Sequence, residues 1–447
     1  DEVTSYVLTS VANAFTGGDS ATTFAGTAGT IDGDVLDGGL GSDSLTLTVT
    51  NADDDGAAFS TTSVENVTVR VSGAGGVELV TGDVTGVETF TASRLGSDLT
   101  LTDFVSLDTD LVISSNSSTA VLDVNYEAGV AAGDGDTVNV SVVRSSDAEI
   151  DLDDVETVNL SSTSAPTGGS NVVDVSGDNM ETVAVTATAN LTLAVDDATT
   201  VTVAGSADVD VTVAAADSTV TSTGTGSLTV NANGANDLTL TGGDGADTFV
   251  MGTTLTADDT IDGGDGVDIL TVTGAGGAII PADAAVSNVE TLTATTGGAD
   301  SIDASIASFD SISVISAANA HTIDITEVTD ESVSITTAGA AGAADDEIAG
   351  VNVNLADGSG DADTLTIAIT NADDDTAMTV GEIDSSDNNV ETIALVLNQG
   401  VDIADASDII IEDVEATAYS SLSVSGAADA TFGTGTAVTL ATVNASE

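Results

Sequence analysis

Hydrophobic and polar residues alternate along most of the chain with a period of two. Clear examples are LTLTVT from Leu45, LTLAV from Leu191, VTVAG from Val201, VDVTVAA from Val209 and SLTVNA from Ser227. This period places Thr on one face of a β-strand and Val or Leu on the other. Gly, Asp, Asn and Ser recur as turn signals roughly every 8 to 12 residues, which is typical of all-β proteins. No segment shows a helical period, so we predict a nearly all-β fold.

A longer pattern divides the chain into repeats. A glycine- and aspartate-rich turn, an alternating strand, an acidic loop and a segment reading V-E-T-apolar follow one another four times, and TNADDD occurs identically at residues 50–55 and 370–375. We predict four β modules at residues 37–132, 133–241, 242–356 and 357–447, after an N-terminal segment at residues 1–36. In that segment, YVLTSVANAF at residues 6–15 is compatible with a short helix or a first strand layer.

The V-E-T segments indicate the length of one structural repeat. In three modules the glutamates occur in pairs that are 23, 25 and 24 residues apart, at Glu65 and Glu88, Glu156 and Glu181, and Glu391 and Glu415. One turn of a parallel β-solenoid has about 20 to 30 residues. We therefore predict right-handed parallel β-solenoid, or β-helix-like, modules, with tandem β-sandwich domains as the alternative. The glutamates are expected to mark strand starts and not binding sites.

Charge excludes several classes of partner. The chain has 74 Asp and Glu against 3 Lys and Arg, which gives a formal net charge of −71. Such a chain repels itself unless cations neutralise part of the charge, and it does not attract nucleic acid or anionic membrane surfaces. Disorder is not expected, because 41% of the residues are hydrophobic and the mean hydropathy is +0.27. Only 2% are aromatic, so the core must consist of small branched side chains in thin layers.

Cysteine and signal patterns restrict how the fold is held together. There is no Cys, so neither disulfides nor thiolate metal sites are available. No run of 18 apolar residues occurs, so we predict no membrane insertion. The sequence starts at Asp1 without a signal-peptide pattern, and we expect a processed product or a fragment. For an extracellular protein of this composition, calcium is the remaining cross-link.

One nonapeptide carries the most specific chemistry. The pattern G-G-x-G-x-D-x-apolar-x occurs at residues 38–46, 242–250 and 263–271, with degenerate copies at 133–138 and 358–365. Its glycines form a tight turn whose backbone oxygens can face a cation, and its aspartate adds a carboxylate. A plain β-turn uses the same residue types, but three complete copies favour several Ca²⁺ ions over Mg²⁺, which keeps its waters. The predicted calcium-binding residues are Gly38, Gly39, Gly41, Asp43, Gly242, Gly243, Gly245, Asp247, Gly263, Gly264, Gly266 and Asp268.

Further acidic residues extend this prediction less specifically. Asp37 and Asp262 precede complete copies, and the degenerate copies contain Asp134, Asp136, Asp361 and Asp363. The clusters at residues 53–55 and 373–375 contain Asp53, Asp55, Asp373 and Asp375. A run of charge is usually a solvated loop that discourages edge pairing. The repetition of the clusters leaves additional Ca²⁺ sites, or bridges to a neighbouring subunit, as the alternative.

Enzyme chemistry has little support in the sequence. His321 is the single histidine, so a Ser-His-Asp triad and most transition-metal sites lack their components. A pair of carboxylates could support glycoside hydrolysis, but so few aromatic residues offer little platform for a sugar. We predict that the protein is not an enzyme.

The nonapeptides GGDGADTFV, GGDGVDILT and GGLGSDSLT resemble RTX-type calcium-binding repeats. Together with the V-E-T segments in a Cys-free chain rich in Thr, Ala, Val and Gly, they resemble the lattice-forming region of Caulobacter-like bacterial surface-layer proteins. That resemblance implies calcium-dependent folding, secretion, and assembly into a calcium-bridged array. The copies here are dispersed instead of forming a long tandem, and no known cell-anchoring domain is recognisable.

The expected function is therefore structural. We expect an extracellular, cell-surface protein that binds itself to form a calcium-dependent surface layer, sheath or filament, with a surface glycan as its anchor. The alternative is a calcium-dependent adhesin or biofilm-matrix module. A third reading attributes the acidity to salt adaptation without specific ions.

Overall fold

The structure is a computed structural model of the whole chain. It describes residues 4–232, 237–274, 276–281, 283–306, 309–316, 321–328, 332–337, 346–356, 364–371, 378–385, 390–399, 409–416, 421–426, 428, 430–433 and 443–446.

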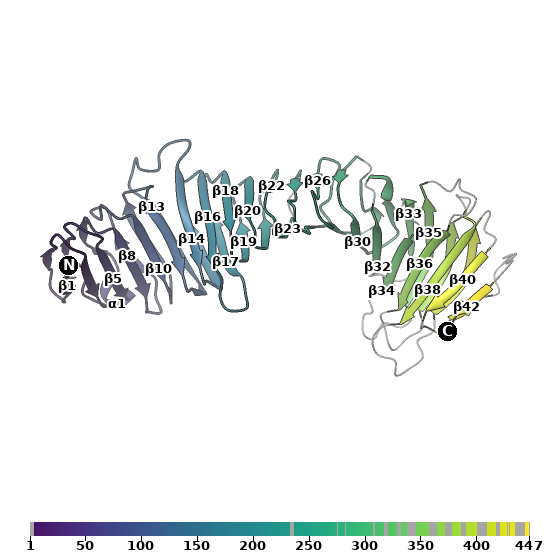
Figure 1. Ribbon diagram of the computed structural model, residues 1–447, viewed down its shortest axis with the longest axis horizontal. Helices are drawn as coiled ribbons and strands as arrows, with labels where there is room; N and C mark the ends of the chain where they lie inside the picture. The colour runs from purple at the N-terminus through teal and green to yellow at the C-terminus, as the bar shows by residue number, and fades with distance from the viewer. Residues whose placement is uncertain are drawn as a thin grey trace. The chain divides into compact units, whose positions relative to one another are not determined.

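The chain folds into parallel, stacked coils that form an all-β solenoid of about 17 turns (Figure 1). It divides into two compact units, Asp1–Val230 and Asn231–Glu447. Each coil adds one strand to the edge of each sheet, so strands close in sequence belong to different sheets. The described part contains no helix long and apolar enough to cross a membrane.

Unit 1 is built from two long parallel sheets and one short sheet. Sheet I contains, in spatial order, β1 (Thr4–Val7), β3 (Thr22–Gly26), β5 (Ser44–Val49), β8 (Asn66–Val71), β10 (Thr89–Ser93), β12 (Asp110–Ser114), β14 (Thr137–Val143), β16 (Thr157–Ser164), β18 (Thr182–Ala187), β20 (Thr200–Gly205) and β22 (Thr219–Ser222). Sheet II contains β6 (Ala57–Ala58), β9 (Val77–Val80), β11 (Leu99–Phe104), β13 (Ser117–Tyr126), β15 (Asp147–Asp151), β17 (Asn171–Ser176), β19 (Leu191–Val195), β21 (Val209–Val213) and β23 (Leu228–Asn231). Sheet III contains β2 (Ala14–Thr16), β4 (Val35–Asp37) and β7 (Ser60–Thr62).

The core of unit 1 lies between these sheets. Along most strands, buried and more exposed residues alternate, as in β19, where Leu191, Leu193 and Val195 are at most 1% exposed. Register is strict because slipping by one residue would turn these apolar side chains to water. Full burial of each Val or Leu stabilises the fold by about 1.5 to 3 kcal/mol before the loss of conformational entropy is counted.

Unit 2 has the same construction. In it, β24 (Thr239–Thr241), β26 (Thr260–Asp262) and β29 (Ala285–Ser287) pair in parallel, in that order. A long sheet contains β25 (Thr248–Gly252), β27 (Ile269–Thr273), β30 (Thr291–Thr296), β32 (Ser311–Ser316), β34 (Ser332–Thr337), β36 (Thr364–Asn371), β38 (Thr392–Gln399), β40 (Ser421–Gly426) and β42 (Val443–Ser446). A further sheet contains β28 (Gly277–Ala278), β31 (Asp300–Asp303), β33 (His321–Val328), β35 (Asp346–Leu355), β37 (Met378–Ser385), β39 (Ile409–Ala416) and β41 (Ala430–Phe432), and a 3₁₀ turn, η1, spans Ala304–Ile306.

The prediction of a parallel β-solenoid is confirmed, and so are the five alternating strands, which are β5, β19, β20, β21 and β23. The open question at residues 6–15 is decided in favour of strands β1 and β2. TNADDD at residues 50–55, expected as an acidic loop, instead includes a one-turn helix, α1 (Asn51–Asp54).

The V-E-T spacing corresponds to one coil in unit 1. The Glu88 N–H donates to the Glu65 carbonyl, and the Glu181 N–H donates to the Glu156 carbonyl, each at 2.9 Å. All four glutamates directly precede a strand of sheet I, as predicted. The third pair does not follow the rule, because Glu391 precedes β38 whereas Glu415 lies near the end of β39, in a different sheet. In this part of the chain, residues 24 apart in sequence therefore do not occupy the same position in successive coils.

Candidate functional site

Buried aspartates occupy corners of the coils, and most of them lie where the chain enters a strand. Seven of them are at most 2% exposed, namely Asp34, Asp43, Asp54, Asp247, Asp259, Asp268 and Asp300. In six of them, Oδ1 accepts a hydrogen bond of 2.5 to 2.9 Å from a backbone N–H of the preceding coil. The donor and acceptor pairs are Asn13 and Asp34, Thr22 and Asp43, Gly29 and Asp54, Leu238 and Asp259, Asp247 and Asp268, and Gly276 and Asp300. These carboxylates join successive coils where the ladder of strand hydrogen bonds stops.

The V-E-T glutamates continue the same ladder. The Asp43 N–H donates to Glu65 Oε2 at 2.6 Å, and the Asp268 N–H donates to Glu290 Oε2 at 2.7 Å. The Asp136 N–H makes the matching bond to Glu156 at 2.8 Å. Asp43 and Asp268 thus each accept a hydrogen bond from one coil and donate one to the next.

The second carboxylate oxygen separates these aspartates into two groups. Oδ2 of Asp34, Asp43 and Asp268 is buried and has no hydrogen-bond partner. The other four are satisfied by local N–H donors, from Thr50 to Asp54, Gly243 to Asp247, Thr256 to Asp259, and Gly297 and Gly298 to Asp300. A buried charged oxygen without a partner costs free energy, so an unpaired one calls for a further ligand.

Two of the unpaired aspartates sit in matching corners, one in each unit. Corner 1 consists of Gly38, Asp43, Ser63 and Glu65. A Cβ built on Gly38 would collide with the Ser63 carbonyl oxygen and would lie 2.5 Å from Asp43 Oδ2. Ser63 has a φ of 54°, a left-handed conformation that is uncommon for a residue with a side chain. Only glycine fits at position 38.

Corner 2 repeats this arrangement with Gly263, Asp268, Asn288 and Glu290. A Cβ on Gly263 would collide with the Asn288 carbonyl oxygen and lie 2.6 Å from Asp268 Oδ2, and Asn288 has a φ of 51°. The sequence separations are identical in the two corners, with 25 residues between Gly and Ser or Asn and 22 between Asp and Glu. The repeated nonapeptide therefore folds into a repeated three-dimensional site.

Burial changes the pKa of two of these carboxyls, Asp34 and Asp268. Burial first, and then the neighbouring carboxylates of Asp247 and Glu290, raise the pKa of Asp268 to about 6, although the hydrogen bond from the Asp247 N–H opposes the shift. Burial also raises the pKa of Asp34 to about 6, opposed by the Asn13 N–H. At both places the charged form of the carboxyl is disfavoured unless a proton or a cation compensates the charge.

The donors at the two corners suit a hard cation. Each corner combines an unpaired buried carboxylate oxygen with a nearby backbone carbonyl, and Ca²⁺ takes such oxygen ligands in flexible geometry. Among the described residues, no three carboxylate or histidine side chains converge as a metal-binding group. A cation here would thus depend on backbone oxygens for most of its ligands.

The third complete nonapeptide differs. Asp247 is fully buried, but its Oδ2 accepts the Gly243 N–H at 2.8 Å. Gly242 is as crowded as its counterparts, because a Cβ there would collide with the Gly263 carbonyl oxygen and Asp247 Oδ2. The same sequence motif therefore gives one internally satisfied turn and two with an unpaired oxygen.

The remaining predicted glycines line the outer part of the turns. Gly39, Gly41, Gly264 and Gly266 have positive φ values between 89° and 150°, which only glycine adopts easily. Gly245 is partly exposed, and its carbonyl oxygen lies against Gly266.

Of the flanking aspartates, Asp37 and Asp262 are half-buried at the ends of β4 and β26. Asp37 Oδ1 accepts the Gly39 N–H, and Asp262 Oδ1 accepts from the Asn288 side chain at 2.7 Å.

In the acidic cluster at 53–55, the two predicted ligands are exposed and the middle residue is buried. Asp53 and Asp55 face solvent, whereas Asp54 is 1% exposed and accepts two backbone N–H groups. The equivalent pair Asp373 and Asp375, and the degenerate-copy residues Asp361 and Asp363, lie outside the described residues.

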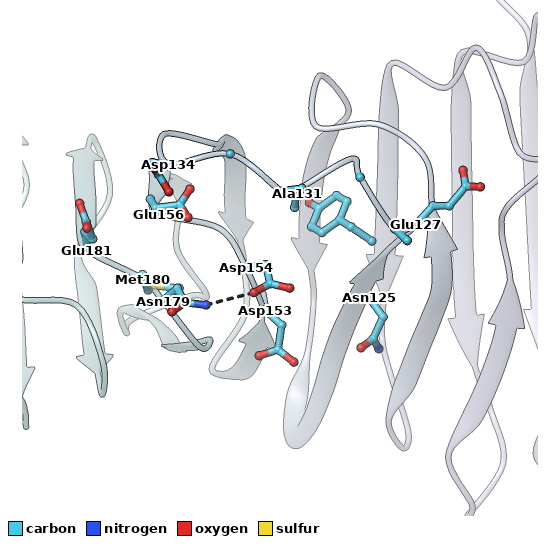
Figure 2. A pocket seen from close by; sticks show the side chains of 15 residues that line it. Asn125, Glu127, Ala131, Asp134, Asp153, Asp154, Glu156, Asn179, Met180 and Glu181 are labelled. Carbon is cyan, nitrogen blue, oxygen red and sulfur yellow. Dashed lines mark hydrogen bonds between the residues drawn. The ribbon is translucent and has the colours of Figure 1, made fainter.

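The degenerate copy at 133–138 borders an open acidic hollow of about 720 Å³ in unit 1 (Figure 2). Its carboxylates are Glu127, Asp134, Asp153, Asp154, Glu156 and Glu181. Asp134 is exposed, and Asp136 is half-buried, with Oδ2 accepting the Gly133 N–H at 3.0 Å. This corner lacks the buried unpaired oxygen of corners 1 and 2.

His321 lies in the core and not in a site. It is 7% exposed, and its Nε2 is 3.1 Å from the Thr296 hydroxyl.

Sequence reasoning missed three buried corner aspartates, Asp34, Asp259 and Asp300, and it named Asp54 only as a member of the acidic cluster at residues 53–55. A signal existed for two of them, because Asp34 and Asp259 each lie four residues before the first glycine of a complete nonapeptide. They precede β4 and β26 as the nonapeptide aspartates precede β5 and β27. Asp54 and Asp300 belong to other local patterns and could not be separated from exposed neighbours.

Comparison with known proteins adds no assignment. No protein-family model matches this chain, and no curated protein is significantly similar to it in sequence.

Proposed function

We propose that the protein is an extracellular structural protein whose solenoid is stabilised by Ca²⁺ at its corners and which self-assembles into a surface layer, sheath or filament. The carrying observation is the unpaired, buried Oδ2 of Asp43 and Asp268 in two corners with the same residue spacing. Burying an unpaired anionic oxygen costs free energy, so its occurrence in two corners of identical spacing is best explained by a bound ligand.

Each corner residue has a distinct part in this proposal. Asp43 and Asp268 bind the ion through Oδ2 and hold the preceding coil through Oδ1. Glu65 and Glu290 fix the aspartate backbone from the following coil. Gly38 and Gly263 leave the space in which carbonyl and carboxylate oxygens approach each other. Bound calcium would supply the positive charge that these buried carboxylates lack, and Asp34 offers a third unpaired oxygen.

A structural role agrees with the architecture. Each coil contacts mainly its neighbours, so the fold presents long, regular surfaces of the kind repeat proteins use for extended contacts. The proposal includes no catalytic step. The charge of −71 opposes association, and cations would reduce that repulsion.

The test is electron microscopy and circular dichroism of the purified chain in CaCl₂ and after EGTA treatment. We expect ordered assemblies in CaCl₂, and loss of assembly with lowered thermal stability in EGTA. Unchanged particles and unchanged thermal unfolding after chelation would rule the proposal out. A chain that stays monomeric in CaCl₂ but binds cells or glycans would be an adhesin, and one that NaCl restores as well as CaCl₂ would be salt-adapted without specific sites.

A further inference from the structure

The two long faces of unit 1 differ sharply in charge. Among the strand residues of sheet I, only Arg70 and Asp110 are charged, so the strands themselves carry no net charge, and the acidic residues Glu65, Glu88, Glu156 and Glu181 lie at the strand starts. Its outward residues are mostly Thr, Ser and Asn. One row in register across five strands consists of Thr137, Thr157, Thr182, Thr200 and Thr219. A neutral sheet is unexpected in a chain with 74 acidic residues.

Sheet II is acidic. Its strands expose only acidic charges, at Glu78, Asp103, Asp123, Asp147, Glu149, Asp151, Asp174 and Asp210. Asp123 lies in register with Asp151 on the next strand, and Glu149 lies in register with Asp174. Like charges directly opposite each other destabilise a sheet.

The titration of these groups reflects the crowding. Burial and then neighbouring carboxylates raise the pKa of Glu149, Asp151 and Asp174. No arginine is among the charges that act on them. The acidic face is therefore not neutralised from within unit 1.

All three basic residues of the chain lie on the other side. Arg70 points outward from β8 in sheet I, and Arg94 and Arg144 directly follow β10 and β14 of the same sheet. Arg94 and Arg144 occupy the same corner of their coils, with φ values of 51° and 54°. Each is exposed, and none forms an ion pair with a described residue. The three unpaired arginines lie at the C-terminal ends of parallel strands, whereas the glutamates lie at the strand starts, so this end of sheet I is a surface suited to an acidic partner.

We propose that sheet I of one copy, with Arg70, Arg94 and Arg144, docks onto the acidic sheet II of a second copy of this chain. The contact is heterologous, since two different faces meet, and such a contact propagates into an open filament when its rotation does not close a ring. The inference rests on the proposed self-assembly and specifies the interface that produces it.

The available area is sufficient for a stable contact. Nine strands from β5 to β22, spaced by roughly 4.8 Å and about 18 Å long, cover about 800 Å² per copy. Two such faces bury about 1,600 Å², the usual size of a specific interface. A recess of about 430 Å³ on sheet I, bordered by Asn159, Ala184 and Ala204, could hold a side chain that protrudes from the partner.

Other occupants fit these surfaces less well. Nucleic acid and an anionic membrane are repelled by the charge of −71 and offer no matching sheet face, whereas a second copy, repelled by the same charge unless cations reduce it, carries acidic residues in register on sheet II. Each copy has both faces, so each molecule can dock through its sheet I to one neighbour and through its sheet II to another.

Charge reversal tests the contact in CaCl₂ by light scattering, sedimentation and electron microscopy. The first variant combines Arg70→Glu, Arg94→Glu and Arg144→Glu, and the second combines Asp123→Arg, Glu149→Arg and Asp174→Arg. We expect each variant alone to need a protein concentration at least about tenfold higher than wild type to assemble. An equimolar mixture should assemble again, because the reversed faces complement each other. A triple Arg→Lys variant is the matched control and should assemble.

Circular dichroism in CaCl₂ establishes that each variant is folded, and recovery in the mixture excludes misfolding as the cause. If wild type assembles and the Arg→Glu variant assembles equally well, or if mixing restores nothing, the docking proposal is wrong while the proposed function stands. If wild type itself does not assemble in CaCl₂, the proposed function fails first.

Discussion

Replacing Asp268 by Asn separates a calcium ligand from a structural aspartate. Asn keeps an oxygen that can accept the Asp247 N–H, at 2.7 Å in the wild-type chain, and removes the buried negative charge. A pKa raised from 3.8 to about 6 corresponds to about 3 kcal/mol at 1.36 kcal/mol per unit. Solvent lies close, because residues 265–267 are exposed, so we expect screening to reduce the effect to about 1 to 2 kcal/mol.

The sign of the effect depends on calcium. In EGTA at pH 8 the wild-type carboxylate is charged and unpaired, so Asp268→Asn should be more stable than wild type. In CaCl₂ the wild type gains about 2.7 kcal/mol per site at a calcium concentration 100 times the Kd, and the variant loses that gain at this corner. For a unit of about 200 residues, 1 kcal/mol shifts the Tm by about 2 to 4 °C.

The assay is thermal unfolding followed by circular dichroism, with Asp259→Asn as the matched control. Asp259 is equally buried and also holds the preceding coil, but its Oδ2 already accepts the Thr256 N–H. The control should therefore lose stability by a similar amount in EGTA and in CaCl₂. The reasoning is refuted if Asp268→Asn is less stable than wild type in EGTA, or if it keeps the full calcium response.

Three further predictions use the same corners. Because the folded-state pKa of Asp34 and Asp268 is raised, protonation stabilises the calcium-free fold at about pH 4, and this stability is lost as the pH rises through about 6. The Tm measured in EGTA should therefore fall over that pH range. A Tm that does not change with pH would contradict this prediction. Gly263→Ala should lower the Tm and weaken calcium binding measured by calorimetry, because its Cβ would meet two oxygens, whereas Gly135→Ala, in open space, should change neither. Asp34→Asn should reduce the number of calcium ions bound without destabilising the chain in EGTA. Asp54→Asn should lower the Tm both in EGTA and in CaCl₂, because both oxygens of Asp54 accept hydrogen bonds. If the two variants change Tm and calcium binding in the same way, Asp34 is not a calcium site.

Much of the fold follows from local pattern. Period-two alternation and turn residues at nearly constant intervals leave few alternatives to stacked parallel strands, because each strand can bury its apolar face only against neighbouring coils. The V-E-T glutamates of unit 1 were predicted correctly as strand starts. The spacing failed at Glu391 and Glu415, where a constant interval spans two different sheets.

The candidate site could be predicted only in part. The nonapeptide identifies Asp43, Asp247 and Asp268 as turn carboxylates, since glycine geometry and the following strand are local. It cannot say which of them is left with an unpaired oxygen. That depends on whether a local N–H, such as that of Gly243 beside Asp247, reaches Oδ2.

By itself, the sequence determined the all-β class, the coil length and the aspartate turns, because these depend on residues near each other along the chain. Only the tertiary structure decided which acids are buried, as at Asp54 between exposed Asp53 and Asp55. Stacking also decided the distribution of charge over the two faces of unit 1. Residues about 20 to 30 apart become neighbours when coils stack, so partners for a carboxylate or an arginine are set by coil register and not by sequence distance.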